Sequence, residues 1–127
     1  MPHAVLQFPA GIYPAEVEAE CPEARATIAV LIGELGRHGP SPEGYSVKNL
    51  GKKKGYLWQI NLKVEQRQVR VLYAPYKDKI VIFRLHKKGS PQEQQHAYDV
   101  AMKRKAEYDE LQKKLERESH GGSRTVH

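Results

Sequence analysis

The chain has 127 residues, of which 39% are hydrophobic and 28% charged, and its formal net charge is +6. This length predicts one domain, and the composition supports a modest core rather than an intrinsically disordered chain. A single cysteine, Cys21, excludes an internal disulfide framework and a site built of several thiolates. No apolar run approaches the roughly 20 residues of a membrane span, and no secretory leader is evident, so we expect a cytoplasmic protein without membrane contact.

The positive charge is concentrated in the middle of the chain. Residues 48–88 contain twelve basic and two acidic side chains, a net charge of +10, whereas residues 1–47 carry −4 and residues 89–127 carry none. A polyanion-binding surface requires such an excess, although lysine-rich loops also serve solubility alone. The near absence of balancing acids favours the polyanion-binding interpretation.

The first third of the chain predicts one short strand and two helices. An apolar run over 4–8 ends at Pro9 and reads as an edge strand. A short helix is expected over 14–20, and a longer one over 22–38, where apolar residues recur at helical spacing. Residues 39–44 form a turn-rich connector that is too short for a domain linker.

The middle of the chain changes to a period of two. Strands are expected over 56–63, 68–73 and 80–86, with a further strand over 47–50. From Pro91 a helix begins, for which Ser90 is the expected N-cap. We therefore predict an α+β domain over 1–118, with the N-terminal helices and the C-terminal helix packed on one face of a small, twisted, mainly antiparallel sheet. Residues 119–127 are expected to form a flexible tail.

The candidate functional side chains lie on the polar side of this predicted sheet. Alternation places Gln59 with Asn61, and Arg84 with His86, on the less apolar side of their strands, with Arg70 on the corresponding side of its own. With helices over the side that bears Trp58, Val69, Val71 and Phe83, the other side would be an open face of arginine, histidine and amide groups. Such a face suits a single-stranded nucleic acid, and fixed cations can stabilise a phosphorane. Only two acids lie in this segment, so we expect no metal and no other cofactor.

Four stretches in this order resemble the RelE/ParE toxin superfamily, most closely its HigB-like, phage-derived branch. They are KNL (48–50), GYLWQIN (55–61), VRVLY (69–73) and HKKGSP (86–91), and Glu93 and Ala97 continue the pattern into the C-terminal helix. Gln59 stands where the pattern has an acid, and Asn61 where it has an arginine. The resemblance covers about residues 45–108 and implies a RelE-like fold.

What the resemblance implies is a toxin of a type II toxin–antitoxin pair that cuts mRNA on the ribosome. The ribose 2′-hydroxyl would attack the adjacent phosphate and leave a 2′,3′-cyclic phosphate without a metal. Arg70 is then assigned to the phosphorane oxygens, His86 to proton transfer, and Lys87 to charge stabilisation. Their ordinary alternatives are an exposed strand arginine, a solvated histidine and a surface lysine.

The remaining basic residues are expected to bind the RNA backbone of the message or ribosome. They are Lys48, Lys52, Lys53, Lys54, Arg67, Arg84 and Lys88. The expected partner is a cognate antitoxin, a helix-turn-helix protein with an acidic docking segment that neutralises the basic surface.

Two other functions remain open at this point. ParE-like members of the superfamily share the fold and inhibit DNA gyrase by binding it, and fold alone does not decide between the two activities. A basic RNA-binding domain without catalysis is the third interpretation. The cluster of Arg70, His86 and Lys87 favours the nuclease, since inhibition by binding needs no group that transfers protons.

Overall fold

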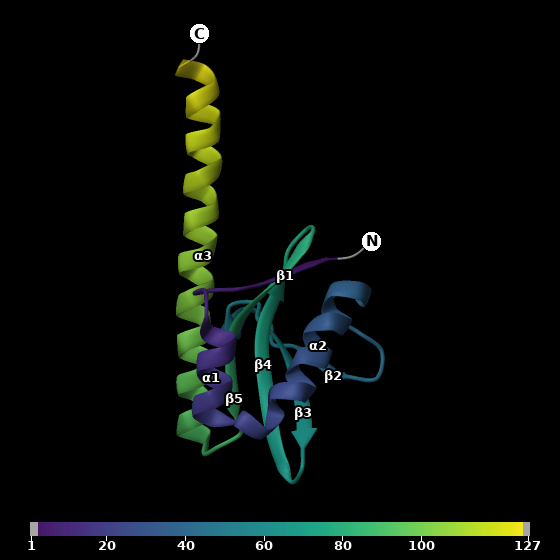
Figure 1. Cartoon of the computed structure of the whole chain (residues 1–127). Coiled ribbons are helices and arrows are strands. Elements are labelled where there is room, and N and C mark those ends of the chain that lie inside the picture. Colours follow the sequence, from purple (N-terminus) through teal and green to yellow (C-terminus); the bar gives the residue numbers. More distant parts are fainter. Residues whose placement is uncertain (1–2, 126–127) are drawn as a thin grey trace.

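The computed structural model describes residues 3–125, and side chains are described for residues 3–118. Three helices and five strands follow one another with two short 3-10 turns (Figure 1). In chain order they are β1 (Ala4–Gln7), α1 (Ile12–Glu20), η1 (Pro22–Ala24), α2 (Arg25–His38), β2 (Ser46–Asn49), η2 (Lys52–Lys54), β3 (Trp58–Val64), β4 (Arg67–Pro75), β5 (Lys79–Lys87) and α3 (Pro91–Thr125).

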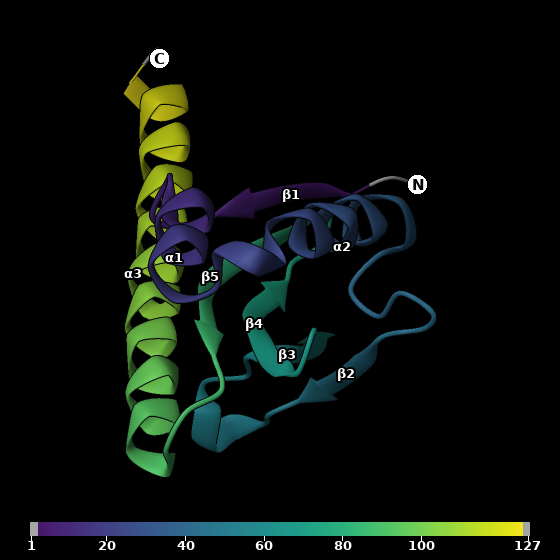
Figure 2. The same cartoon turned by 60° about the horizontal axis from the view of Figure 1, so that its bottom comes forward.

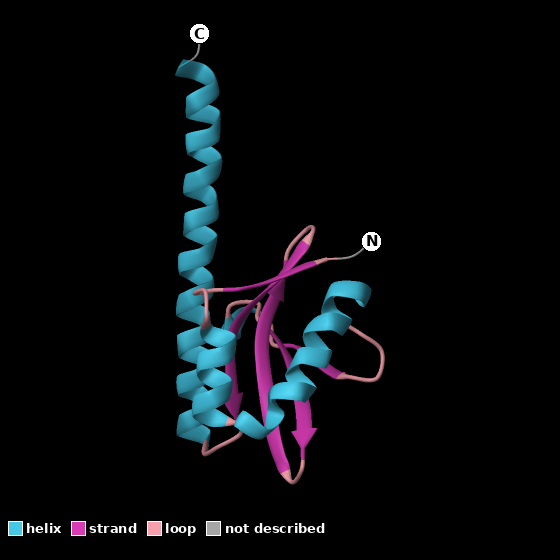
Figure 3. Cartoon of the chain, viewed as in Figure 1, coloured by secondary structure: helices cyan, strands magenta, loops and turns pink. Residues whose placement is uncertain are grey.

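The five strands form one mixed sheet in the order β1-β5-β4-β3-β2 (Figure 3). Strands β2 to β5 are joined by antiparallel pairings, and β1 lies parallel to β5 at the edge. The expected α+β class and the mainly antiparallel sheet are therefore confirmed. The edge position expected for the first strand is also confirmed.

The ends of the helices follow local chemistry. α2 ends with Arg37 and His38 in its last turn, and Gly39 takes a φ of 87° that residues other than glycine rarely adopt. α3 begins with the expected cap at Ser90. The Ser90 Oγ accepts a hydrogen bond from the Glu93 backbone N (3.2 Å), and Glu93 Oε1 accepts one from the Ser90 backbone N (3.0 Å). This reciprocal pair fixes where the chain turns from β5 into α3.

One face of the sheet is covered by α1 and α2 (Figure 2). Ile28, Leu31 and Leu35 of α2 pack on alternate residues of the central strands, such as Ile60 and Val71. Tyr73 is fully buried in the same cluster, and Trp58 packs half-buried against it; both share a face of their strands with apolar residues. This layer is the larger of the two apolar clusters.

The opposite face is covered by α3. Ala97, Ala101 and Tyr108 pack against Leu72 and Phe83 in a second apolar cluster. The helices therefore lie on both faces of the sheet, not on one as the sequence indicated. The apolar stripe of α3 had been assigned correctly, but a stripe does not say which side of a sheet it meets.

Phe83 lies on the side opposite to the one that strict alternation predicted. Leu72 and Tyr73 are neighbours in β4, yet they pair with Arg84 and Ile82 of β5, so Phe83 is an extra residue at a bulge. The bulge places Phe83 under α3 rather than under α2. The assignment of Phe83 to the face of Trp58 is corrected accordingly.

α3 is longer than expected. The sequence placed its end near residue 118, whereas its backbone stays helical to Thr125 and extends well beyond the sheet (Figure 1). Of the predicted tail over 119–127, the last two residues lie outside the described part, and flexibility of the segment stays a prediction. Within residues 3–125, no helix is both long enough and apolar enough to cross a bilayer.

Candidate nucleic-acid interface

A row of polar side chains crosses four strands on the α3 side of the sheet. Ser46 pairs with Asn61, Asn61 with Arg70, and Arg70 with His86. Directly opposed residues of antiparallel strands point to the same face, so the row lies on one side. The predicted polar face therefore exists, with Asn61, Arg70 and His86 side by side.

The first turns of α3 cover Arg70 in this row. The Arg70 guanidinium donates from NH1 to Gln94 Oε1 of α3 and, at 3.4 Å, to the Tyr98 hydroxyl. Tyr98 in turn donates to Gln59 Oε1 (2.9 Å), and the Gln59 amide donates to Asn61 Oδ1 (2.9 Å). Arg70 is thus half-buried in a hydrogen-bonded network, not exposed on an open face as the sequence indicated.

His86 is buried, with 2% of its surface exposed. Its pKa is lowered to about 4, mainly by burial and also by the positive charges of Arg84 and Arg70, against an opposing hydrogen bond to the Lys87 backbone. Its Nδ1 lies 3.3 Å from the Lys87 carbonyl oxygen, so Nδ1 carries the proton and donates it. The imidazole is therefore neutral at pH 7 and can accept a proton, but it cannot supply one.

Beyond α3 the same side of the sheet is open and basic. Lys63 pairs with Gln68, and the Lys88 backbone N donates to the Gln68 carbonyl (2.8 Å), so these three residues form a row parallel to the first. Lys48 of β2 pairs with Gln59 and lies on the same side. We call the exposed or half-exposed set Lys48, Asn61, Lys63, Gln68 and Lys88 the open polar face; it contains no acid.

A hollow of about 430 Å³ adjoins the open polar face at the sheet end nearest the β3–β4 turn. It is lined by Gln66, Arg67, Gln68, Lys87 and Lys88, and we call it the basic hollow. Arg67 lies 3.4 Å from Glu23, which neutralises part of its charge, whereas Lys87 and Lys88 are exposed. Three of the predicted RNA-contacting or catalytic cations therefore meet at one hollow.

Lys87 lies on the other side of β5 from His86. It pairs with Val69, which is buried under α1 and α2. The strand alternation that brings Arg70 and His86 together therefore directs Lys87 away from them. The three predicted catalytic residues do not form one cluster.

Arg84 is held by carboxylates of α1. It lies 3.0 Å from Glu16 and 3.4 Å from Glu20, with 15% of its side chain exposed. Glu16 also accepts hydrogen bonds from the Leu85 backbone N (2.9 Å) and from Arg104 of α3 (2.7 Å). Arg84 thus joins α1 to the sheet, and its charge is not available to an RNA backbone.

The lysine turn η2 lies beside the start of α3. Lys52 and Lys53 are exposed. Lys54 donates to Gln95 of α3 (2.8 Å), and its ammonium lies 4.7 Å from the centre of the Tyr98 ring. The turn therefore lies next to the hydrogen-bonded network under α3, and its other two lysines, Lys52 and Lys53, remain exposed.

Sequence reasoning missed two residues that hold the predicted cations, Gln94 beside Arg70 and Glu16 beside Arg84. Gln94 was outside the predicted apolar stripe, yet it lies three and seven residues before Ala97 and Ala101, on the same side of the helix. Extending the stripe back by one turn would have found it. Glu16 gave no comparable signal, because its partners Arg84 and Arg104 are distant in sequence.

Comparisons with known proteins assign no family to this chain. No family model matches it, and neither a curated protein nor a solved structure matches it. In the described part of the chain, no three histidine, cysteine or acidic side chains are arranged to hold a metal ion. The evidence on function is therefore the chemistry of the open polar face and the adjoining network.

Proposed function

We propose that this protein is an endoribonuclease toxin of the RelE/ParE type that binds single-stranded RNA on the open polar face. The observation that carries the proposal is a set of three exposed lysines without a neighbouring acid on the same side of the sheet as Arg70. They are Lys48 of β2, Lys63 of β3 and Lys88, which directly follows β5. The α+β fold, with α1 and α2 between β1 and β2 and α3 after β5, is compatible with the RelE-like fold that the resemblance implies.

Single-stranded RNA fits this face better than a duplex does. Adjacent strands lie about 4.8 Å apart, so the cations of β2, β3 and the end of β5 span roughly 15 Å of the sheet surface. A flexible strand can follow such a surface and place successive phosphates against separate lysines. Asn61 and Gln68 lie between the lysines and supply neutral hydrogen-bonding groups.

Cleavage would proceed by attack of a ribose 2′-oxygen on the adjacent phosphorus, with loss of the 5′-oxygen. The proton of the 2′-hydroxyl passes to a base, and the same base, once protonated, returns a proton to the departing 5′-oxygen; the products are a 2′,3′-cyclic phosphate and a 5′-hydroxyl. Arg70 is the group suited to the phosphorane charge, and neutral His86 beside it is the base. Gln94 and Tyr98 cover Arg70, so the first turn of α3 has to move before RNA reaches either group.

The proposed cleavage step gives no role to Lys87 or Arg84. Lys87 lies on the other side of β5, and Arg84 is paired with two carboxylates. The expected partners are translating ribosomes, hence a cytoplasmic location, and a cognate antitoxin. An acidic segment of that antitoxin would be complementary to the open polar face.

Replacing Arg70 tests the proposal. We expect Arg70→Ala to lower single-turnover cleavage on the order of 10²-fold, as loss of one charge-stabilising donor does. The measurement uses end-labelled RNA with excess protein and EDTA, with and without translating ribosomes. Arg67→Ala is the matched control, because Arg67 lies in the same strand but at the exposed end. It should weaken RNA binding and leave the saturated cleavage rate nearly unchanged.

Two outcomes would contradict the proposed activity. One is undiminished cleavage by folded Arg70→Ala, and the other is cleavage that EDTA abolishes. The burial of His86 favours one second candidate, an RNA-binding protein without catalysis. That candidate predicts salt-dependent RNA binding by the parent protein and no RNA cleavage either with or without translating ribosomes.

A further inference from the structure

A separate cavity of about 280 Å³ lies at the free edge of β5. β1 pairs with β5 only as far as Ile82. Beyond that point the edge is flanked by the end of α1 and the first turns of α3, which leave the cavity between them. Its lining residues are Glu20, Arg84, His86, Lys87, Gln92, Glu93 and His96.

The charged groups in this cavity are largely paired with one another or with the backbone. Glu20 lies 3.4 Å from both Arg84 and the Lys87 backbone N. Glu93 accepts the hydrogen bond from the Ser90 backbone N that caps α3. The groups left to meet a ligand are therefore the Lys87 ammonium, the Gln92 amide and the imidazoles of His86 and His96.

His86 lines this cavity and has an unused hydrogen-bond acceptor. Its side chain is buried, its Nδ1 donates to the Lys87 carbonyl, and its Nε2 has no hydrogen-bond partner in the described part of the chain. A buried polar atom without a partner costs free energy unless a ligand or water satisfies it. In the proposed cleavage this atom takes the proton of a ribose 2′-hydroxyl, so the cavity lies next to the reacting nucleotide.

The cavity and the basic hollow are neighbours that share Lys87 in their walls. A phosphate in the basic hollow would therefore sit beside whatever occupies the cavity. The cavity itself is close to the lower end of the 300–1,000 Å³ that small-molecule sites occupy. One flat ring with donors and acceptors on its edge suits that size.

We propose that this cavity binds one base of a single-stranded RNA whose phosphate lies against Lys87 and Lys88, an inference that rests on the proposed function. Gln92 contacts the edge of the base, and the exposed imidazole of His96 stacks on its face. A free anion fits less well, because the carboxylates of Glu20 and Glu93 line the same space.

The experiment compares RNA with and without bases. The full chain is titrated into two fluorescent 12-nucleotide probes with the same 2′-O-methyl backbone, which prevents cleavage through the 2′-oxygen. One probe is uridine throughout and the other is abasic throughout. We expect the abasic probe to bind more weakly, and His96→Ala to weaken uridine binding about five-fold or more, the effect of losing one base stack.

His38→Ala is the matched control, since His38 is also an exposed helical histidine but lies at the end of α2. It should leave both affinities unchanged, and His96→Ala should leave binding of the abasic probe unchanged. Equal affinities of the parent for the two probes would overturn the base-binding inference while leaving RNA binding intact. So would a folded His96→Ala that behaves like His38→Ala. Failure of both probes to bind would overturn the proposed function and this inference together.

Discussion

On one face of the sheet, Ile60, Val71 and Leu85 meet α1 and α2, and all three are fully buried. Their neighbours in sequence point to the other face. These are Asn61 after Ile60, His86 after Leu85 and Arg70 before Val71. The same strands thus present an apolar surface to one helical layer and a polar row to the other. α1 and α2 pack on apolar residues, whereas the start of α3 covers hydrogen-bonded polar groups.

This difference shows how a small domain keeps a basic surface without losing its core. Alternation in a strand gives each residue to one face only, so apolar and charged sets can be chosen independently. α3 then divides its own face into two parts. Its later turns cover an apolar half with Phe83 and Tyr108, and its first turns border the open polar face.

The largest expected effect comes from breaking the apolar half of the α3 face. Phe83→Ala should lower the free energy of unfolding by about 3–5 kcal/mol, because Phe83 is fully buried beside Tyr108 and its loss leaves a cavity. Urea unfolding followed by circular dichroism measures this change. A loss below about 1 kcal/mol would mean that α3 contributes little to the core.

The burial of His86, on the polar half of the same face, can be tested by the pH dependence of the free energy of unfolding. Its pKa is about 4 in the folded chain and near 6.5 when unfolded, so the unfolded chain takes up the proton first. The contribution of neutral His86 to the free energy of unfolding is fully present above pH 6.5 and is lost as the pH falls through about 4. The total loss is about 3 kcal/mol.

The measurement is urea unfolding at several pH values between about 7 and 4, for the parent and for His86→Gln. The glutamine cannot titrate, so the variant should lose less stability on acidification. Identical pH dependence of the two proteins would mean that His86 is accessible to water and titrates normally.

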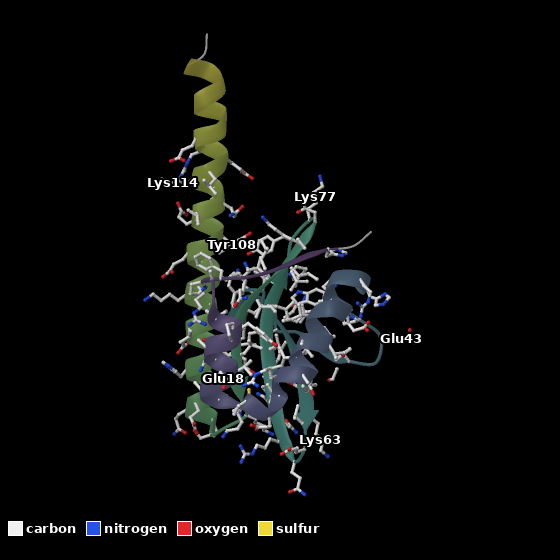
Figure 4. All side chains as sticks on the ribbon, viewed as in Figure 1. Glu18, Glu43, Lys63, Lys77, Tyr108 and Lys114 are labelled. Carbon is white, nitrogen blue, oxygen red and sulfur yellow. The ribbon has the colours of Figure 1, made fainter. Side chains whose placement is uncertain are left out.

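The smallest effect is expected at the exposed end of the open polar face. Lys63→Ala should change the free energy of unfolding by less than about 0.5 kcal/mol and reduce the salt dependence of RNA binding by about one phosphate contact. Lys77, at the opposite end of the sheet in Figure 4, is the matched control. Lys77→Ala should change neither quantity. Equal effects of the two substitutions would mean that net charge, and not this face, attracts RNA.

Much of the fold could be predicted from local chemistry. The period of two in β3 and β4, the helical spacing of Ile28 and Leu31, and the cap at Ser90 each depend on residues close in sequence. The alternation in each strand also placed Arg70, Asn61 and His86 on a shared polar side, which the pairing of the strands confirms. These features need no knowledge of distant contacts.

The tertiary structure decided which polar groups remain free. Which face α3 covers, the bulge at Phe83, and the pairing of Arg84 with Glu16 and Glu20 depend on residues far apart in the chain. The sequence by itself determined the strands, the helices and the location of the positive charge, since these follow from side-chain type and spacing. Burial of His86 and engagement of Arg70 by Gln94 were determined only by packing, because desolvation and hydrogen bonding depend on what lies nearby in space.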